Sequence, residues 1–329
     1  MSRVVDVAPR STAVSWLSGL SGKPGAQLTT LLIVLIAVGA LLTPNFLSEV
    51  NVFAVLQSVI PSLFVGLGAS LALYAGMADL SIGSVIGVSA IVFAITQEAH
   101  WPEALGMAAS VGTGLVVGLL NALATVRFRA EPLIVTLGML SALRGVIFVI
   151  GGDHSKVAVS PPLENLVSYR FGPVPMLFAG LVLLFVIVAL YLSRSRIGRH
   201  IQAAGSDQDV AVRAGISAGR IRLALLVLSA VLAALAGLSY VGLLDSAPVT
   251  LGSGYELQVY AAILISGFSL TSGGIGNPIV TVVGLMIFAV LSNLIGLLNI
   301  NPSWQDVVTG GILLIAVGAN VLRRGDRFD

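Results

Sequence analysis

The chain has no cysteine among its 329 residues and only three histidines, His100, His154 and His200. Without cysteine, disulfides, zinc–thiolate sites, iron–sulfur clusters and thiol nucleophiles are excluded. The histidines lie in separate loops and are not spaced i,i+4, so the sequence predicts no metal site. No pairing of a nucleophile with a base is evident, and no catalytic residue is predicted.

Charged residues are scarce as well: they make up 10% of the chain, while hydrophobic residues make up 57%. A soluble domain typically carries about 25% charged residues, and a chain this apolar would expose too much hydrocarbon to water. The composition therefore predicts a polytopic membrane protein. Residues 1–26 have no long apolar core or cleavage site of a signal peptide, and they are expected to form a cytosolic tail.

A phosphate-binding G-x-x-x-x-G-K-[ST] motif is also missing, because the only Gly-Lys pair, Gly22-Lys23, is followed by proline. No cofactor is therefore expected in this chain, and any energy from ATP must come from a partner. No soluble domain is expected either, since the longest inner loop, 194–222, is too short to bury a core of its own.

Long apolar runs, in contrast, recur along the whole chain. A helix crosses the hydrocarbon core in about 20 residues, and each backbone group in lipid needs an internal partner. The predicted fold class is an all-α polytopic membrane protein with about ten transmembrane helices, some of them broken. The expected spans are 27–44, 52–75, 80–96, 104–125, 132–150, 172–193, 223–243, 257–269, 277–299 and 303–322, of which the third and the eighth are short.

The positions of the basic residues predict the orientation. If the N-terminus is cytosolic, the inner segments hold 14 of the 17 Lys and Arg residues, and the outer loops hold only Lys156 and Arg170. An excess of basic residues marks the cytosolic side, so both termini are expected there. The expected organisation is a tail over 1–26, a transmembrane domain over 27–322 that includes the inner loop 194–222, and a tail over 323–329.

One carboxylate, Asp79, interrupts the apolar stretch "GMADLSIGS" at residues 76–84. A carboxylate inside the bilayer is costly unless it is paired or hydrated. Asp79 could cap a helix that begins at Leu80 by accepting a hydrogen bond from the backbone N–H of Ser81 or Ile82. The alternatives are direct contact with a substrate or a gate, and an ordinary interfacial loop. The surrounding glycines and serines would let neighbouring helices approach closely, as at a hinge.

Other polar side chains interrupt later apolar segments. Arg144, on the helix expected to begin at Pro132, either extends toward the outer face or pairs with a carboxylate in a transport pathway. The stretch 252–284 places polar residues at the outer edge of a span and a glycine-rich turn at Ser272–Gly276. A faint similarity between 76–88 and 267–279 suggests an internal repeat. The predicted substrate-pathway residues are Asp79, Ser81, Ser84, Asn121, Thr136, Arg144, Tyr255, Glu256 and Asn293.

The basic loop at 193–222, "SRSRIGRHIQAAGSDQDVAVRAGISAGRIR", has the signals of a short helix. Ser206 or Asp207 can cap it, it would run to about Ala214, and Gly215 is a suitable stop. A helix this short is not stable alone and needs a docking surface. The loop is therefore predicted to dock a cytosolic partner, while contact with anionic lipid headgroups is the alternative.

Four segments, in this order, resemble the permease subunits of bacterial ABC importers for ribose, xylose, galactosides and related sugars. The resemblance covers about residues 45–320. Met77-Ala78 stands where the family usually has Gly-Ile, and Ser266-Gly267 where it usually has Gly-Gly, which leaves the identity of the sugar open. The segments are "GMADLSIGS" (76–84), "PLIVTLGMLSALRG" (132–145), "GRHIQAAGSDQDVAVRAGI" (198–216) and "GSGYELQVYAAILISGFSLTSGGIG" (252–276).

The resemblance implies a pathway formed by two permease chains, identical or related, in the bacterial inner membrane. It also implies an extracytoplasmic sugar-binding protein and a cytosolic ABC ATPase, and ATP and Mg²⁺ would bind to that ATPase. The loop at 199–216 would then be the coupling helix seated on the ATPase. The coupling residues implied in this way are Arg199, Ala204, Gly205, Ser206, Asp207, Asp209, Arg213 and Gly215.

Other functions stay open at the level of sequence. A permease of the same fold could serve amino acids, nucleosides or a furanosyl signalling molecule. A secondary transporter would need no ATPase, but the chain lacks the several buried carboxylates or histidines typical of a proton relay. No nucleic-acid partner is expected.

Overall fold

The structure is a computed structural model that describes the backbone of residues 24–270 and 272–325 and side chains as far as Leu314. Most of the expected N-terminal tail and residues 326–329 of the expected C-terminal tail lie outside the described residues. The helices are α2 (Pro24–Leu42), α3 (Glu49–Ser58), α4 (Ile60–Tyr74), α5 (Ile82–Glu98), α6 (Glu103–Ala122) with the π-helix η1 (Leu123–Arg127), α7 (Pro132–Gly151), α8 (Pro161–Ser168), α9 (Met176–Arg194), α10 (Arg196–Ser206), α11 (Gln208–Arg213), α12 (Ala218–Leu244), α13 (Tyr255–Ile265), α14 (Pro278–Leu297) and α15 (Ser303–Gly325).

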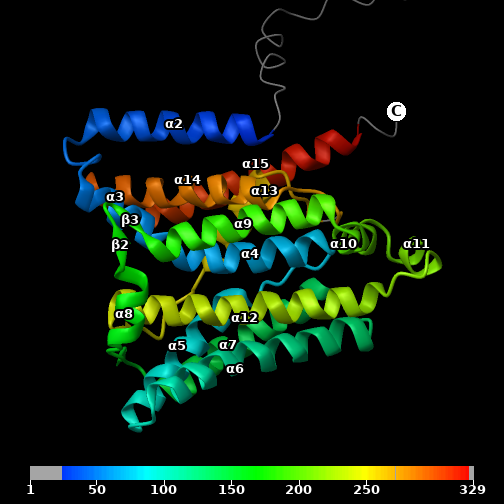
Figure 1. Ribbon diagram of the computed structural model, residues 1–329, viewed down its shortest axis with the longest axis horizontal. Helices are drawn as coiled ribbons and strands as arrows, with labels where there is room; N and C mark the ends of the chain where they lie inside the picture. The colour runs from blue at the N-terminus through cyan, green and yellow to red at the C-terminus, as the bar shows by residue number, and fades with distance from the viewer. Residues whose placement is uncertain (1–23, 271, 326–329) are drawn as a thin grey trace, which may run out of the picture.

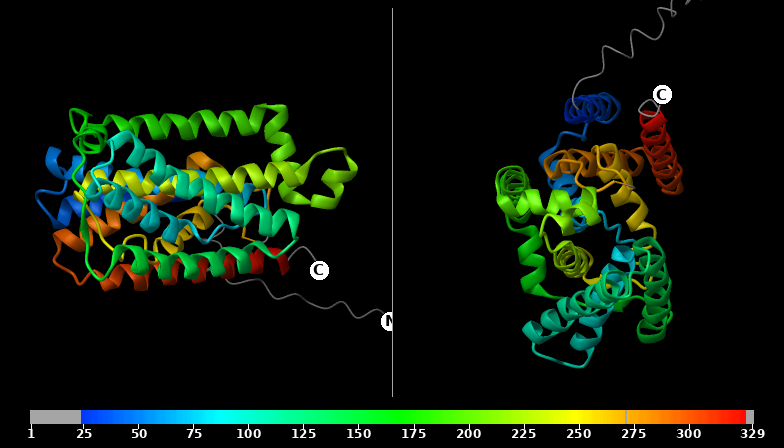
Figure 2. Two further views of the ribbon diagram at one scale, coloured as in Figure 1. Left: turned by 90° about the horizontal axis from the view of Figure 1, so that it is seen from below. Right: turned by 90° about the vertical axis from the view of Figure 1, so that its right-hand side faces the viewer.

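Long helices run along a common direction and form a bundle (Figure 1). Helices α10 and α11 project from one end of the bundle. The beginning of α2 and the end of α15 lie at this same end (Figures 1 and 2). At the opposite end are α8 and two small antiparallel pairs of strands, β1 (Lys156–Val157) with β4 (Ser246–Ala247) and β2 (Arg170–Phe171) with β3 (Val174–Pro175). These four short strands are a minor departure from the predicted all-α fold.

Seven of the described helical segments are long and apolar enough to cross a membrane. They are α2, α3 with α4, α6 with η1, α7, α9, α12 and α14. The segments expected to be short are shorter than a full span: α5 has 17 residues and α13 has 11. At 1.5 Å per residue, α13 extends about 16 Å, roughly half of the hydrocarbon thickness.

Two helices at the centre of the bundle, α4 and α5, are buried on nearly all sides. Helices that are apolar all round are suited to such positions. Small residues allow the close contacts: a Cβ at Gly68 would lie 2.8 Å from the Cα of Ser229 on α12. Helix α2, in contrast, packs mainly on α14 at the periphery of the bundle (Figure 2, right).

Both α4 and α13 end in the same local geometry. After α4, Gly76 has φ +76° and the N–H of Met77 donates to the carbonyl of Ala72 at 2.9 Å. After α13, Gly267 has φ +95° and the N–H of Phe268 donates to the carbonyl of Ile263 at 3.4 Å. This is the six-residue cap in which glycine supplies the left-handed position. The two segments with faint sequence similarity therefore share a helix-ending motif.

The structure corrects three boundaries. The span expected at 52–75 is two helices that meet at Val59, just before Pro61. The helix after Asp79 begins at Ile82 instead of Leu80. The span expected at 257–269 ends at Ile265, because the cap at Gly267 stops it.

Candidate functional site

The break between α4 and α5 is built around the buried Asp79 carboxylate. Its Oδ1 accepts hydrogen bonds from the backbone N–H of Ser81 at 3.1 Å and from the Ser81 hydroxyl at 2.6 Å. The predicted hydrogen bond from the Ser81 N–H is therefore confirmed, but Asp79 does not cap α5, because Ser81 is itself the N-cap residue of that helix and no side chain caps it. The Asn121 amide of α6 donates to the Ser81 hydroxyl at 2.9 Å, and the Asp79 N–H donates to the Tyr260 hydroxyl of α13 at 2.6 Å. The Asp79 Oδ2 and the Ser229 hydroxyl of α12 are both buried without a hydrogen-bond partner.

Helix α7 is joined to this break by two further predicted residues. The Thr136 hydroxyl donates to its own helix at Pro132, 2.9 Å away, and lies 3.4 Å from the carbonyl oxygen of Ala78. The Ser84 hydroxyl of α5 donates to the carbonyl of Leu140 at 2.8 Å. Five predicted pathway residues thus meet at one break, and all five are fully buried. In this conformation they hold helices together and do not line an open cavity.

Arg144 and Glu256 lie close enough to interact electrostatically, although they do not form a direct ion pair. The Arg144 guanidinium turns inward and donates to the carbonyl of Leu251 at 2.8 Å. Glu256, 9% exposed, packs against Gly83 of α5, where any side chain would collide with its carboxylate. The bond to Leu251, in the segment between α12 and α13, shows where Arg144 is held. Its two predicted roles, extension toward the outer face and pairing with a carboxylate in a transport pathway, both stay predictions.

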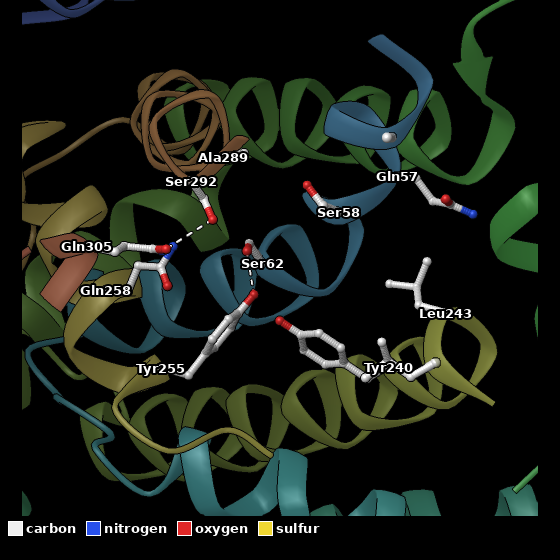
Figure 3. A pocket seen from close by; sticks show the side chains of 12 residues that line it. Gln57, Ser58, Ser62, Tyr240, Leu243, Tyr255, Gln258, Ala289, Ser292 and Gln305 are labelled. Carbon is white, nitrogen blue, oxygen red and sulfur yellow. Dashed lines mark hydrogen bonds between the residues drawn. The ribbon is translucent and has the colours of Figure 1, made fainter. Parts of the chain in front are cut away.

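The last two predicted pathway residues, Asn293 and Tyr255, lie in different surroundings. Asn293 of α14 pairs reciprocally with Asn51 of α3, with distances of 2.8 Å and 3.1 Å, and fastens those two helices together. Tyr255 bonds the Ser62 hydroxyl and meets Tyr240 edge-on, with ring centroids 5.8 Å apart. Tyr255 also lines a cavity of about 320 Å³, to which Asn293 does not contribute (Figure 3).

The inner loop contains two helices where the sequence predicted one. Asp207 caps α11, because its Oδ1 accepts from the N–H groups of Asp209 at 2.9 Å and Val210 at 3.0 Å. Gly215, with φ +77°, ends this helix as predicted. Helix α10 was missed, although Ser195 caps it through a 2.8 Å bond from the Gly198 N–H. The predicted residues Arg199, Ala204, Gly205 and Ser206 lie on α10, and Asp209 and Arg213 lie on α11.

A second helix break lies between α13 and α14. Helix α10 contacts this break and the α4–α5 break at a cluster of four glycines, which we call the glycine junction: Gly76, Gly205, Gly273 and Gly274. A Cβ at Gly273 would lie 2.6 Å from the Gly76 nitrogen and 2.7 Å from the Gly205 Cα. The Gly274 N–H donates to the carbonyl of Tyr74 at 2.7 Å. The end of α4, the segment after α13 and α10 therefore touch mainly through backbone, and the Gln202 amide of α10 adds a 3.2 Å hydrogen bond to the carbonyl of Gly274.

Substitution of Gly205 is expected to disrupt this junction. A Cβ there would overlap the Tyr74 carbonyl oxygen and lie 2.8 Å from the Gly274 nitrogen, and neither backbone can move freely. We expect Gly205→Ala to destabilise the folded protein by about 1–3 kcal/mol, as overpacking of a tight site does. Thermal unfolding in detergent would measure the loss. Gly180→Ala, on α9 with no atom within 4 Å of the added Cβ, is the control and should unfold like the wild type.

Arg222 in the first turns of α12, which the sequence showed only as one of the inner basic residues, joins the end of α4 to α10 and α11. Its Nε donates to the carbonyl of Ala75 at 3.2 Å and its Nη2 to the carbonyl of Ala204 at 2.9 Å. Its Nη1 bonds the Gln208 side chain of α11. The sequence offered one signal of this connecting role, an arginine near the start of a long apolar helix, because a cation at such a position needs a partner.

Comparison with known proteins places this arrangement in a family. The family model described as "Branched-chain amino acid transport system / permease component" matches residues 51–317, well over half of the chain. The chain belongs to this permease family. Both helix breaks, α10, α11 and the cavity beside Tyr255 lie within the matched region, whereas the peripheral α2 lies outside it.

Several curated permeases are similar to this family member over most of its length. "Ribose import permease protein RbsC" of Escherichia coli (strain K12) is 30% identical over 87% of this chain and 90% of that protein. "L-arabinose ABC transporter permease protein AraH" of Azospirillum brasilense is 30% identical over 90% and 87%. "Fructose import permease protein FrcC" of Rhizobium meliloti is 28% identical over 91% and 85%. No solved structure matches the chain significantly.

The permease has no group of three metal-binding side chains among its described residues. Its site consists of hydroxyls, amides, two buried carboxylates and arginines, which can bind and orient a molecule but offer no obvious nucleophile with a base.

Proposed function

We propose that this chain is the membrane-spanning permease subunit of a bacterial ABC importer for a sugar. A second permease chain, the same or a related one, would complete the translocation pathway in the inner membrane. An extracytoplasmic binding protein would deliver the sugar, and a separate cytosolic ATPase would bind ATP and Mg²⁺. The sugar is proposed because the three relatives named above import ribose, arabinose or fructose by their names.

The observation that carries the proposal is the attachment of α10 and α11 to both helix breaks. These helices project from the bundle, and their contacts reach the ends of α4 and α13 through the glycine junction and Arg222. A partner that moves α10 and α11 would therefore move the backbone around Asp79. This is the mechanical connection that an importer without its own nucleotide site requires.

The proposed orientation puts the α10–α11 end in the cytosol, since the inner loops expected from the sequence carry most of the basic residues. Ten crossings would then consist of the seven long spans together with α5, α13 and α15. Because α13 is too short to cross alone, the segment that leads from it to α14 would complete the passage. Non-helical backbone at this depth is tolerated where protein buries it, as the glycine junction does here.

Reconstitution tests the function. The permease, its neighbouring ATPase and its binding protein are placed in proteoliposomes, and uptake of D-ribose, L-arabinose, D-fructose and L-leucine is measured with and without ATP. ATP-dependent uptake of one of the sugars is expected. Uptake that follows a proton gradient and survives ATP depletion would contradict the proposal, and uptake of leucine alone would favour the amino acid named in the family description.

The cap of α11 gives a second, sharper prediction. Asp207→Ala removes the acceptor of two N–H groups from a six-residue helix, so α11 should fray. Loss of a cap costs about 1 kcal/mol, so we expect about fivefold weaker association with the ATPase. Asp207→Asn keeps the accepting oxygen and is the matched control. Equal association and full stimulated ATP hydrolysis in both variants would contradict the coupling role of α11.

A further inference from the structure

A polar cavity of about 320 Å³ lies between α3 and five other helices (Figure 3). It lies toward the end of the bundle where α3 is, away from α10 and α11 (Figure 1). Residues from the last turns of α12 and α14 and from the first turns of α13 and α15 line it. Its volume is at the lower end of the range for small-molecule sites, about 300–1,000 Å³. Size and position therefore suit a small ligand that arrives from the side opposite the α10–α11 helices.

The lining of this cavity consists of neutral groups that form hydrogen bonds. None of the described residues that line it is charged. A neighbouring hollow of about 390 Å³, between Phe64, Met107 and Leu163, is lined almost wholly by apolar side chains, as a gap between membrane helices is expected to be. Neutral polar groups thus gather in the cavity beside Tyr255, whereas a larger cavity of about 810 Å³ beside α11 is polar because charged side chains such as Arg129, Glu131 and Asp209 line it. The main hydrogen-bonding residues of the cavity beside Tyr255 are Ser62, Tyr240, Tyr255, Gln258, Ser292 and Gln305.

Several of these groups retain free hydrogen-bonding capacity. Ser62 bonds Tyr255, and the Ser292 hydroxyl donates to Gln305 Oε1 at 3.0 Å, which leaves the Gln305 amide N–H₂ available. The half-buried Gln258 side chain extends toward the cavity (Figure 3). Polar groups inside a membrane protein need partners, and amides and hydroxyls can both donate and accept. A ligand with many hydroxyl groups offers matching partners.

We propose that this cavity binds the transported sugar within a single permease chain, with Gln258 and Gln305 as its main hydrogen-bonding residues and the tyrosine rings as its apolar faces. This inference rests on the proposed function. A zwitterionic amino acid or a phosphorylated sugar would bring charges into a partly buried site without an opposite charge, which is costly. A neutral monosaccharide brings none.

Helix α13 connects the cavity to the buried break. Tyr255 and Gln258, three residues apart, face the cavity. Glu256 and Tyr260, four residues apart, face Gly83 and the N–H of Asp79 instead. Residues at these spacings share a helix face, so the two sides of one short helix contact the ligand site and the break. Occupation of the cavity can thereby act on the α4–α5 break.

Direct binding tests the site independently of the binding protein. The complex of permease and ATPase is placed in lipid nanodiscs without binding protein, and its affinity for D-ribose, L-arabinose, D-fructose and L-leucine is measured by calorimetry. One sugar is expected to bind and leucine is not. Gln258→Leu and Gln305→Leu should each raise the Kd for that sugar about twofold to tenfold, the effect of one lost hydrogen bond.

Gln97→Leu is the matched control, because Gln97 of α5 is a buried amide that does not line this cavity. It should leave the Kd unchanged. If reconstituted uptake is ATP-dependent but the Kd is the same in the wild type, Gln258→Leu and Gln305→Leu, or if no sugar binds, the site is wrong while the proposed function stands. If uptake is not ATP-dependent, the proposed function fails irrespective of the Kd values.

Discussion

Replacing Arg222 with methionine is expected to abolish the stimulation of ATP hydrolysis by sugar-loaded binding protein, while the complex still assembles and hydrolyses ATP at its basal rate. Methionine fills a similar space but removes every hydrogen bond from the guanidinium to the end of α4, α10 and α11. Hydrogen bonds of a charged group contribute about 1.5–3 kcal/mol each, so losing them should separate α10 from the break. We expect at least about a tenfold loss of stimulation, equivalent to one such bond.

The decisive measurement is the number of sugar molecules transported per ATP hydrolysed. A purely structural role would lower the amount of assembled complex but leave this ratio intact, whereas a transmitting role lowers the ratio itself. Arg222→Lys should be intermediate, since an ammonium retains the charge but lacks the planar fork that reaches three acceptors. Arg220→Met is the control. The Arg220 side chain, two residues earlier in the chain, is exposed, so this variant should behave like the wild type.

An unchanged transport ratio in Arg222→Met would show that α10 communicates with the break through other contacts. The glycine junction is the available alternative, because it joins α10 to the end of α4 and to the segment after α13 without Arg222. If Arg222→Met fails to assemble, Arg222→Gln and Arg222→Lys give the same comparison with milder changes. Coupling as good as wild type in both would reject the role of Arg222.

The long helices could be predicted from sequence because their length and composition are local properties. The helix α7 begins at Pro132, as expected, and α9, α12 and α14 lie within a few residues of their predicted spans. The caps at Asp207 and Gly215 were also readable, and so was the hydrogen bond from the Ser81 N–H to Asp79, since each acts on backbone within three residues. Local chemistry therefore identified where helices end.

Contacts between distant segments could not be predicted in the same way. The acceptors of Arg222 lie on three other elements, and the cavity takes residues from α3, α4, α12, α13, α14 and α15. No spacing in the sequence relates Gln258 to Gln305. Helix α10 was missed for another reason: its buried face consists of Gly198, Ile201, Ala204 and Gly205, a weakly apolar pattern inside a basic loop.

Asp79→Leu is expected to reduce the yield of folded permease severely, whereas Asp79→Asn should be mild. Asparagine keeps an oxygen that can accept from the N–H and hydroxyl of Ser81, and the bond from the residue 79 N–H to Tyr260 uses only backbone. Leucine leaves the Ser81 N–H without an acceptor in a site that water does not reach. Each buried group left without a partner costs about 1–3 kcal/mol.

The two variants are compared by yield in fluorescence-detected size-exclusion chromatography, by thermal unfolding and by reconstituted uptake. Asp153→Leu, at an exposed position in the segment before α8, is the control for adding leucine and should match the wild type. A network effect predicts that stability and uptake fall together in Asp79→Leu and are largely kept in Asp79→Asn. Complete loss of uptake in both, with normal yield and unfolding temperature, would assign the function to the negative charge.

The hydrogen bonds around Asp79 are the reason to expect that Asp79→Asn keeps stability and uptake while Asp79→Leu loses both. The Asp79 Oδ1 accepts two hydrogen bonds from Ser81, and the Ser81 hydroxyl accepts one from Asn121. These bonds hold the carboxylate against neighbouring protein groups. It is fully buried and separate from the cavity that Tyr255 lines. A carboxylate so placed fixes the shape of the break that α10 and α13 contact, and an uncharged side chain with the same accepting oxygen can do the same.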